Sequence, residues 1–148
     1  MIRFEQVSKT YRGGFQALKN VSFQIEKGEM IFVAGHSGAG KSTVLKLIAG
    51  ITKPSSGKVW MNGRDIGSLN DNQIGFLRQH IGIVFQDHKI LFDRSVLQNV
   101  LLPLQIIGYG RAEAEKRARV AIAKVGLAGR ENADPVTLSG GEQQRLCI

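Results

Sequence analysis

The stretch that decides the fold is "GHSGAGKST", Gly35 to Thr43. It fits the pattern G-x-x-x-x-G-K-[ST], in which glycines let the backbone curl around phosphate oxygens. The apolar run "MIFVA", residues 30–34, precedes it, and "VLKLIAG", residues 44–50, follows it. These predict a strand buried on both faces, a loop and a short buried helix that ends at Gly50, which is the placement that phosphate binding requires.

The predicted nucleotide site takes in the whole loop. When a loop of this pattern binds a nucleotide, the lysine, here Lys41, reaches the outer phosphates, and the hydroxyl of the next residue, here Ser42, holds Mg²⁺. The alternative is a glycine-rich turn with a solvent-facing lysine, which does not explain the Lys-Ser pair at this spacing. The candidate nucleotide-binding residues are Gly35, His36, Ser37, Gly38, Ala39, Gly40, Lys41, Ser42 and Thr43.

Composition places the chain among ordinary soluble globular proteins. It has 148 residues, of which 43% are apolar and 22% charged, enough for one domain with a core. The net charge of +8 leaves open a nucleic acid, an anionic membrane or a phosphate-rich ligand, but the basic residues are spread out. One cysteine, no signal-peptide core and no apolar run of about 20 residues predict a cytosolic protein.

Periodicity predicts strands first and helices later. Residues 2–4 and 21–25 alternate apolar and polar, which indicates an antiparallel portion. The apolar run "IGIVF", residues 81–85, predicts a second buried strand in a parallel sheet around the phosphate loop. A further strand is expected at 58–61, before a turn at Asn62-Gly63. From Arg111 we expect a helix that stops at Gly126, with Glu113–Arg117 and Glu115–Arg119 pairs. Its predicted apolar face is Ala114, Ala118, Ala121, Ile122 and Val125.

The last stretch, "LSGGEQQRLCI", residues 138–148, predicts one more helix start. Ser139 followed by Glu142 is the pattern of a capping box, in which each side chain caps the other residue's backbone N–H. Gly140 and Gly141 nevertheless stand in the first turn, although each is less favourable than Ala by about 1 kcal/mol in a helix interior. We infer that something other than helix stability requires bare backbone there.

Four stretches together resemble the ATP-binding domain of the ABC transporter superfamily over the whole chain. They are "TYRGG" (10–14), "GHSGAGKST", "GIVFQD" (82–87) and "LSGGEQQR" (138–145), and the last is the most specific. The resemblance implies an α/β fold: a phosphate-loop nucleotide-binding core of ABC type, an N-terminal antiparallel portion and a helical subdomain. Residues 1–86 would form the core, and 87–148 the glutamine-loop connection and helical subdomain of a single partial domain.

The resemblance also implies roles for further residues, with ATP and Mg²⁺ as cofactors. Tyr11 would stack on adenine, and Gln86 would contact Mg²⁺ or the attacking water, so Ser42 and Gln86 are the metal candidates. In a homodimer, the γ-phosphate held by one subunit would be contacted by the other subunit's Ser139, Gly140, Gly141 and Glu142. The plainer alternatives are a half-buried aromatic at Tyr11 and an ordinary polar residue after a strand at Gln86.

Within the superfamily, "GHSGAGKST" and "FQDHKILFDR" (85–94) are most similar to the ATPases of bacterial cell division. That resemblance implies a membrane subunit as partner, no nucleic acid, and a place on the cytoplasmic face of the inner membrane at the division septum. Leu91, Phe92 and Arg94 are the candidates for docking that partner. Two alternatives stay open: a lipoprotein-release or macrolide-export ATPase, and a nucleotide-binding module that does not hydrolyse.

The sequence departs from the family after the signature stretch. The Asp-Glu pair and the later histidine that serve hydrolysis in the family have no counterpart, and "LCI", residues 146–148, is not its usual continuation. We therefore expect an N-terminal fragment, produced by truncation, by deliberate expression of a piece or by a frameshift. We expect it to be inactive alone and either marginally stable or reliant on a partner. The three histidines, His36, His80 and His88, show no metal-ligand spacing, and Cys147 has no recognisable activating partner.

Overall fold

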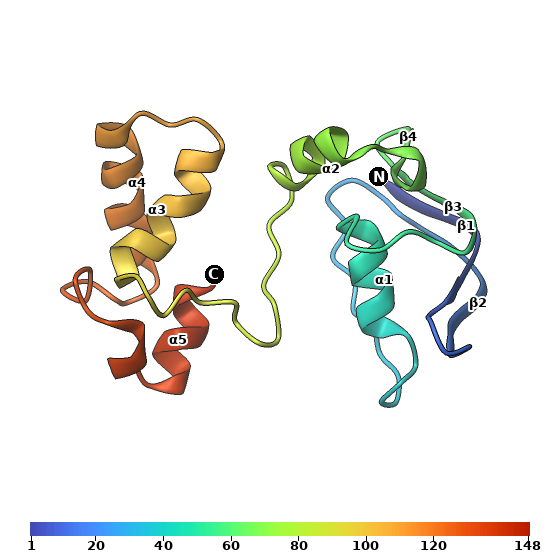
Figure 1. Cartoon of the computed structure of the whole chain (residues 1–148), viewed down its shortest axis with the longest axis horizontal. Helices are drawn as coiled ribbons and strands as arrows, with labels where there is room; N and C mark the ends of the chain where they lie inside the picture. The colour runs from blue at the N-terminus through green and yellow to red at the C-terminus, as the bar shows by residue number, and fades with distance from the viewer. The chain divides into compact units, whose positions relative to one another are not determined.

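The computed structural model describes residues 1–148. It divides into two compact units, Met1–Gly82 and Ile83–Ile148. Strands are confined to the first unit, and the second contains only helices and their connections (Figure 1). The phosphate loop belongs to the first unit, and the predicted glutamine and signature residues belong to the second.

The first unit is built on a four-stranded sheet with the order β2-β1-β3-β4. The strands are β1 (Ile2–Thr10), β2 (Gln16–Ile25), β3 (Ser56–Met61) and β4 (Arg64–Asp65). Every pair is antiparallel, which confirms the antiparallel portion expected from the alternation near the N-terminus. The turn predicted at Asn62-Gly63 is also present, with φ values of 49° and 79° that suit a tight hairpin turn.

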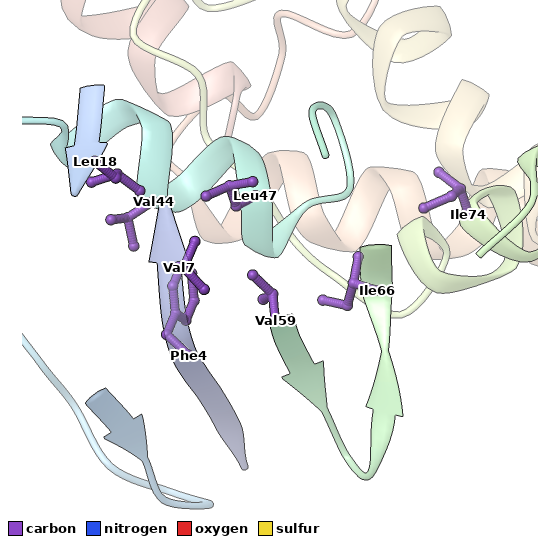
Figure 2. Packing of buried hydrophobic residues seen from close by; sticks show 8 residues of the cluster. All are labelled: Phe4, Val7, Leu18, Val44, Leu47, Val59, Ile66 and Ile74. Carbon is purple, nitrogen blue, oxygen red and sulfur yellow. The ribbon is translucent and has the colours of Figure 1, made fainter. Parts of the chain in front are cut away.

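One face of this sheet is covered by α1 (Lys41–Ile48). Figure 2 shows side chains of α1 and of the strands meeting between helix and sheet, where Phe4 is only 1% exposed. The helix ends as predicted, at Gly50 with a φ of 62°. After η1 (Ile66–Ser68), helix α2 (Asp71–Arg78) closes the end of this core. The buried cluster is Phe4, Val7, Leu18, Val44, Leu47, Val59, Ile66 and Ile74.

The two buried strands predicted at residues 30–34 and 81–85 are absent, and with them the parallel sheet. Neither run pairs with another strand, and Phe32 is 86% exposed and Val84 62%. The physical reason is that a strand needs hydrogen bonds to a neighbour, and the only paired strands of these 148 residues are β1 to β4. An apolar run indicates a tendency to be buried but does not supply the strand that would cover it.

The second unit packs α3 (Val96–Ile106) against α4 (Arg111–Lys124), followed by η2 (Pro135–Thr137) and α5 (Gly140–Leu146). Helix α4 agrees with the sequence in its stop at Gly126, where φ is 74°, and in both predicted ion pairs. Its predicted apolar face is correct except at Ala121, which is exposed because it lies outside the stripe facing α3. The core of the unit is Val96, Leu97, Ala118, Ile122, Leu127 and Leu138.

Two phenylalanines of the first unit test this arrangement, because one is buried and the other is not. Phe4→Ala should lower the free energy of unfolding by about 3–5 kcal/mol, since it empties the core between β1 and α1. Phe32→Ala should change it by less than about 0.5 kcal/mol, since Phe32 is 86% exposed. Urea unfolding of the 148-residue chain measures both. Equal losses would mean that residues 30–34 form the buried strand that the sequence predicts.

Candidate nucleotide site

The phosphate loop is a compact turn whose glycines take backbone conformations that other residues avoid. Gly35, Gly38 and Gly40 have φ values of 152°, 80° and 89°. The Lys41 side chain folds back over the loop, and its Nζ donates to the carbonyls of Gly35 at 2.7 Å and His36 at 2.8 Å. The lysine cation therefore stands at the loop, where a bound polyphosphate needs positive charge.

The end of the loop is fixed against the sheet at Gly40. A Cβ added there would lie 2.5 Å from the Ala17 carbonyl oxygen and 2.7 Å from Leu18 Cδ2. Helix α1 begins at the next residue with no side-chain cap and no acidic residue in its first turn. Its N-terminal N–H groups and positive dipole end therefore meet no opposing carboxylate of their own turn, and the loop suits an anion.

Tyr11, far from the loop in sequence, is joined to it in the structure. Its hydroxyl oxygen lies 3.3 Å from Oγ1 of Thr43 in the first turn of α1. Tyr11 directly follows β1, and Thr43 is buried at 7% exposure. Two of the predicted nucleotide residues are thus in contact, which places an aromatic ring beside the phosphate loop.

Gln86 lies at an exposed turn of the second unit. The turn is tightened by a 2.5 Å pair between Asp87 and Lys89, and the Lys89 hydrogen bond holds the pKa of Asp87 below its ordinary value. His88 and Lys89 have positive φ values of 57° and 55°, which non-glycine residues seldom adopt. The sequence resemblance predicts a glutamine loop at this strained segment, and the role of Gln86 stays a prediction.

The signature stretch forms the capping box that its residue order predicts. Ser139 N–H donates to the Glu142 carboxylate at 2.8 Å, and Glu142 N–H donates back to the Ser139 hydroxyl at 3.4 Å. The Ser139 backbone N–H, followed by its hydroxyl, holds the pKa of Glu142 below its ordinary value. The nearby Arg130, 3.5 Å from the carboxylate, acts in the same direction.

The predicted docking residues also lie in the second unit. Leu91 is 36% exposed and Phe92 52%. The backbone at Leu91 is held by the Asn99 side chain of α3, which accepts from Leu91 N–H at 2.8 Å and donates to its carbonyl at 2.9 Å. The apolar Phe92 side chain is thus presented to solvent by a segment fixed to a helix.

The side chains that could bind a metal or act as nucleophiles do not gather in one site. The structure brings together no group of three or more His, Cys, Asp or Glu side chains that could hold a metal ion. Burial raises the pKa of the Cys147 thiol, so it stays protonated near neutral pH. Its Sγ donates to the carbonyl of His88 at 3.2 Å.

The sequence did not predict that Lys9 contacts Tyr11. Its Nζ lies over the Tyr11 ring, 5.2 Å from the centroid. The only signal was nearness along the chain, because Tyr11 lies just beyond β1 and the alternation of the strand does not extend to it. What the sequence could not indicate is the anchor, the carbonyl of Lys53, which accepts from Lys9 Nζ at 2.7 Å.

A glycine loop that leads into a helix, with a lysine folded over it, defines a phosphate-binding core. Similarity to known proteins gives its class. The ABC transporter family profile matches residues 18–148, and the chain belongs to this family. Among curated proteins it is 53% identical over 148 residues to the cell division ATP-binding protein FtsE of Escherichia coli K12, covering 100% of this chain and 67% of that protein. It is 44% identical over 151 residues to the methionine import ATP-binding protein MetN of Geobacillus kaustophilus, covering 100% of this chain and 44% of MetN.

Solved structures agree with this class. The ATP-binding cassette MJ0796, in a dimeric post-hydrolysis state bound to ADP and Pi, superposes with a TM-score of 0.91 at 36% identity. The match covers 99% of this chain and 67% of that one. The expected ABC-type fold class is thereby confirmed.

None of the helices is both long and apolar enough to span a membrane.

The Glu142 cap gives a pH-dependent prediction. Because the pKa of Glu142 is lowered in the folded chain, the cap contributes its full stabilisation above about pH 4.3, the ordinary pKa of glutamate. This stabilisation is lost as the pH falls through the lower pKa of the folded state. A carboxyl NMR titration should find the Glu142 midpoint below about 4.3. Ser139→Ala should raise that midpoint only partly, because the Ser139 backbone N–H still donates.

Ser68→Ala, in the other unit, serves as the control and should leave the Glu142 midpoint unchanged. A midpoint at or above the ordinary value in the unsubstituted chain would contradict the observed capping box.

Proposed function

We propose that this chain is the nucleotide-binding part of a cell-division ABC ATPase of the FtsE type, which couples ATP binding and hydrolysis to a membrane subunit. The observation that carries the proposal is the assembled phosphate loop, with Lys41 on the loop carbonyls, in a chain 53% identical to FtsE over all 148 residues. The lower identity to MetN favours cell division over methionine import.

In this proposal the residues of the loop bind Mg·ATP. Backbone N–H groups of Gly35–Gly40 and the N-terminus of α1 surround the phosphates, and Lys41 moves from the loop carbonyls to the outer phosphates. Ser42, exposed in the first turn of α1, provides an oxygen ligand for Mg²⁺, which prefers such donors and keeps waters as well. The same turn carries no acidic residue, so it suits the anionic phosphates that bring the metal with them.

Hydrolysis requires two copies of the chain in this proposal. Ser139 and the bare backbone of Gly140 and Gly141 meet the γ-phosphate bound to the partner copy. The dimeric state of MJ0796 supports an arrangement of two copies. The carboxylates and histidine that complete hydrolysis in the family are not among these 148 residues. We therefore expect these residues alone to bind ATP and not to hydrolyse it.

The membrane partner in this proposal is FtsX, met on the cytoplasmic face of the inner membrane at the division septum. The support is the exposed Phe92 on a segment that Asn99 fixes to α3, an apolar anchor suited to a short amphipathic helix. Leu91 and Arg94 would contribute the rest of the contact. An ATPase of lipoprotein release or macrolide export is the alternative, and partner choice separates the two.

ATP binding is tested by two lysines of the same helix. Lys41→Ala should weaken Mg·ATP binding about tenfold or more, because it removes the charged donor to the outer phosphates. Lys46→Ala, at the other end of α1, should change the affinity less than about twofold, because it lies away from the loop. Calorimetry measures the Mg·ATP affinity of both variants. Equal affinities of Lys41→Ala and Lys46→Ala would contradict the proposed site. The same samples should release no phosphate above background.

Partner choice is tested by two exposed phenylalanines, in the intact protein co-expressed with FtsX of the same organism. Phe92→Asp should abolish co-purification with FtsX and leave ATP affinity within about twofold, because the change lies on the surface. Phe76→Asp, at 58% exposure in the first unit, should retain FtsX. Capture of a lipoprotein-release or export permease in place of FtsX would overturn the cell-division proposal and leave the ATP-binding proposal intact.

A further inference from the structure

The Tyr11 ring is held in place by contacts at two points. Its hydroxyl lies 3.3 Å from Thr43 Oγ1, and the Lys9 ammonium lies over the ring, 5.2 Å from the centroid. Lys9 is itself fixed, because Nζ donates to the Lys53 carbonyl at 2.7 Å. The backbone is fixed too, since Tyr11 N–H donates to the Phe15 carbonyl at 2.9 Å.

These contacts leave the ring little freedom to turn. A hydrogen bond at the hydroxyl anchors its far end, and a cation over one face resists rotation of the ring plane. A side chain that is already ordered loses less conformational entropy when a ligand stacks on it. Lys9 occupies one face, so a stacked base would take the opposite face.

The hairpin that carries Tyr11 approaches the phosphate loop and α1 at two places. Gly40 at the end of the loop lies so close to the Ala17 carbonyl of β2 that a Cβ there would be 2.5 Å from its oxygen. Tyr11, just beyond β1, contacts Thr43 in the first turn of α1, two residues after Lys41. A ligand with phosphates on the loop and a flat group on Tyr11 meets two parts with a fixed spacing.

We propose that Lys9 and Thr43 are positioning residues that hold the Tyr11 ring as a preformed platform for the purine base of the bound nucleotide. This inference rests on the proposed ATP binding and on the stacking of Tyr11 on adenine that the resemblance implies, and it adds which residues hold the ring for that contact. Lys9 acts through the ring and does not touch the phosphates. Its removal should therefore weaken binding of a nucleotide and spare a ligand that has phosphates only.

The test compares Mg·ATP with Mg·tripolyphosphate, which lacks base and ribose, by calorimetry on the 148-residue chain. Lys9→Met removes the ammonium and keeps the apolar stem, and Tyr11→Phe removes the hydroxyl and keeps the ring. Each should weaken ATP binding about three- to tenfold and leave tripolyphosphate binding within about twofold. Because the two variants remove different contacts, poor folding of one leaves the other as the test.

Lys58→Met is the matched control. Lys58 lies over the Trp60 ring at 5.5 Å, so this variant removes one positive charge and one cation–π contact from the same sheet. It should leave both affinities within about twofold. An equal loss of ATP binding in Lys58→Met would overturn the proposal, because net charge would then explain the effect.

The remaining outcomes separate this inference from the proposed function. Equal weakening of both ligands in Lys9→Met would show that Lys9 shapes the phosphate loop, and unchanged ATP affinity in both variants would show that the platform does not depend on these contacts. Either result overturns the inference while phosphate binding stands. An unsubstituted chain that binds neither ligand would overturn the proposed function, and the inference with it.

Discussion

The first unit depends on one close approach, between Gly40 and the Ala17 carbonyl oxygen. A Cβ at Gly40 would lie 2.5 Å from that oxygen, so only glycine lets the start of α1 press against β2. With the helix start fixed there, Val44 and Leu47 reach the core formed with Phe4, as Figure 2 shows. The same contact fixes the end of the phosphate loop to the hairpin that carries Tyr11. The geometry of the nucleotide site and the packing of the core therefore have one common origin.

Features that depend on neighbours along the chain could be predicted from the sequence. The Asn62-Gly63 turn, the helix ends at Gly50 and Gly126 and the Ser139–Glu142 capping box each involve residues within about one helical turn of each other. In such cases residue type and spacing nearly determine the conformation. The lysine fold over the phosphate loop is of this kind too, because Lys41 bonds the carbonyls of Gly35 and His36 in the same short stretch.

Features that depend on distant partners could not be predicted. The pairing of β1 with β3 joins Phe4 to Val59, and no local pattern indicates it. The failure at residues 30–34 and 81–85 has the same origin, since apolar runs indicate burial without identifying the covering strand. For the site, the resemblance predicted a role for Tyr11, but its contacts with Thr43 and Lys9 depend on how the hairpin meets α1.

The glycines of the signature stretch are explained by neither kind of constraint. Neither has a positive φ; a Cβ at Gly140 would meet nothing within 4 Å, and one at Gly141 only the Arg145 side chain at 3.7 Å. The fold of this chain would therefore accept alanine at both positions, which would favour helix α5 by up to about 1 kcal/mol each. The capping box by Ser139 and Glu142 offsets part of that cost. Nothing within these 148 residues demands glycine there. The γ-phosphate contact proposed above would account for both glycines, because it needs an approach to the N-terminus of α5 that is closer than a methyl group allows.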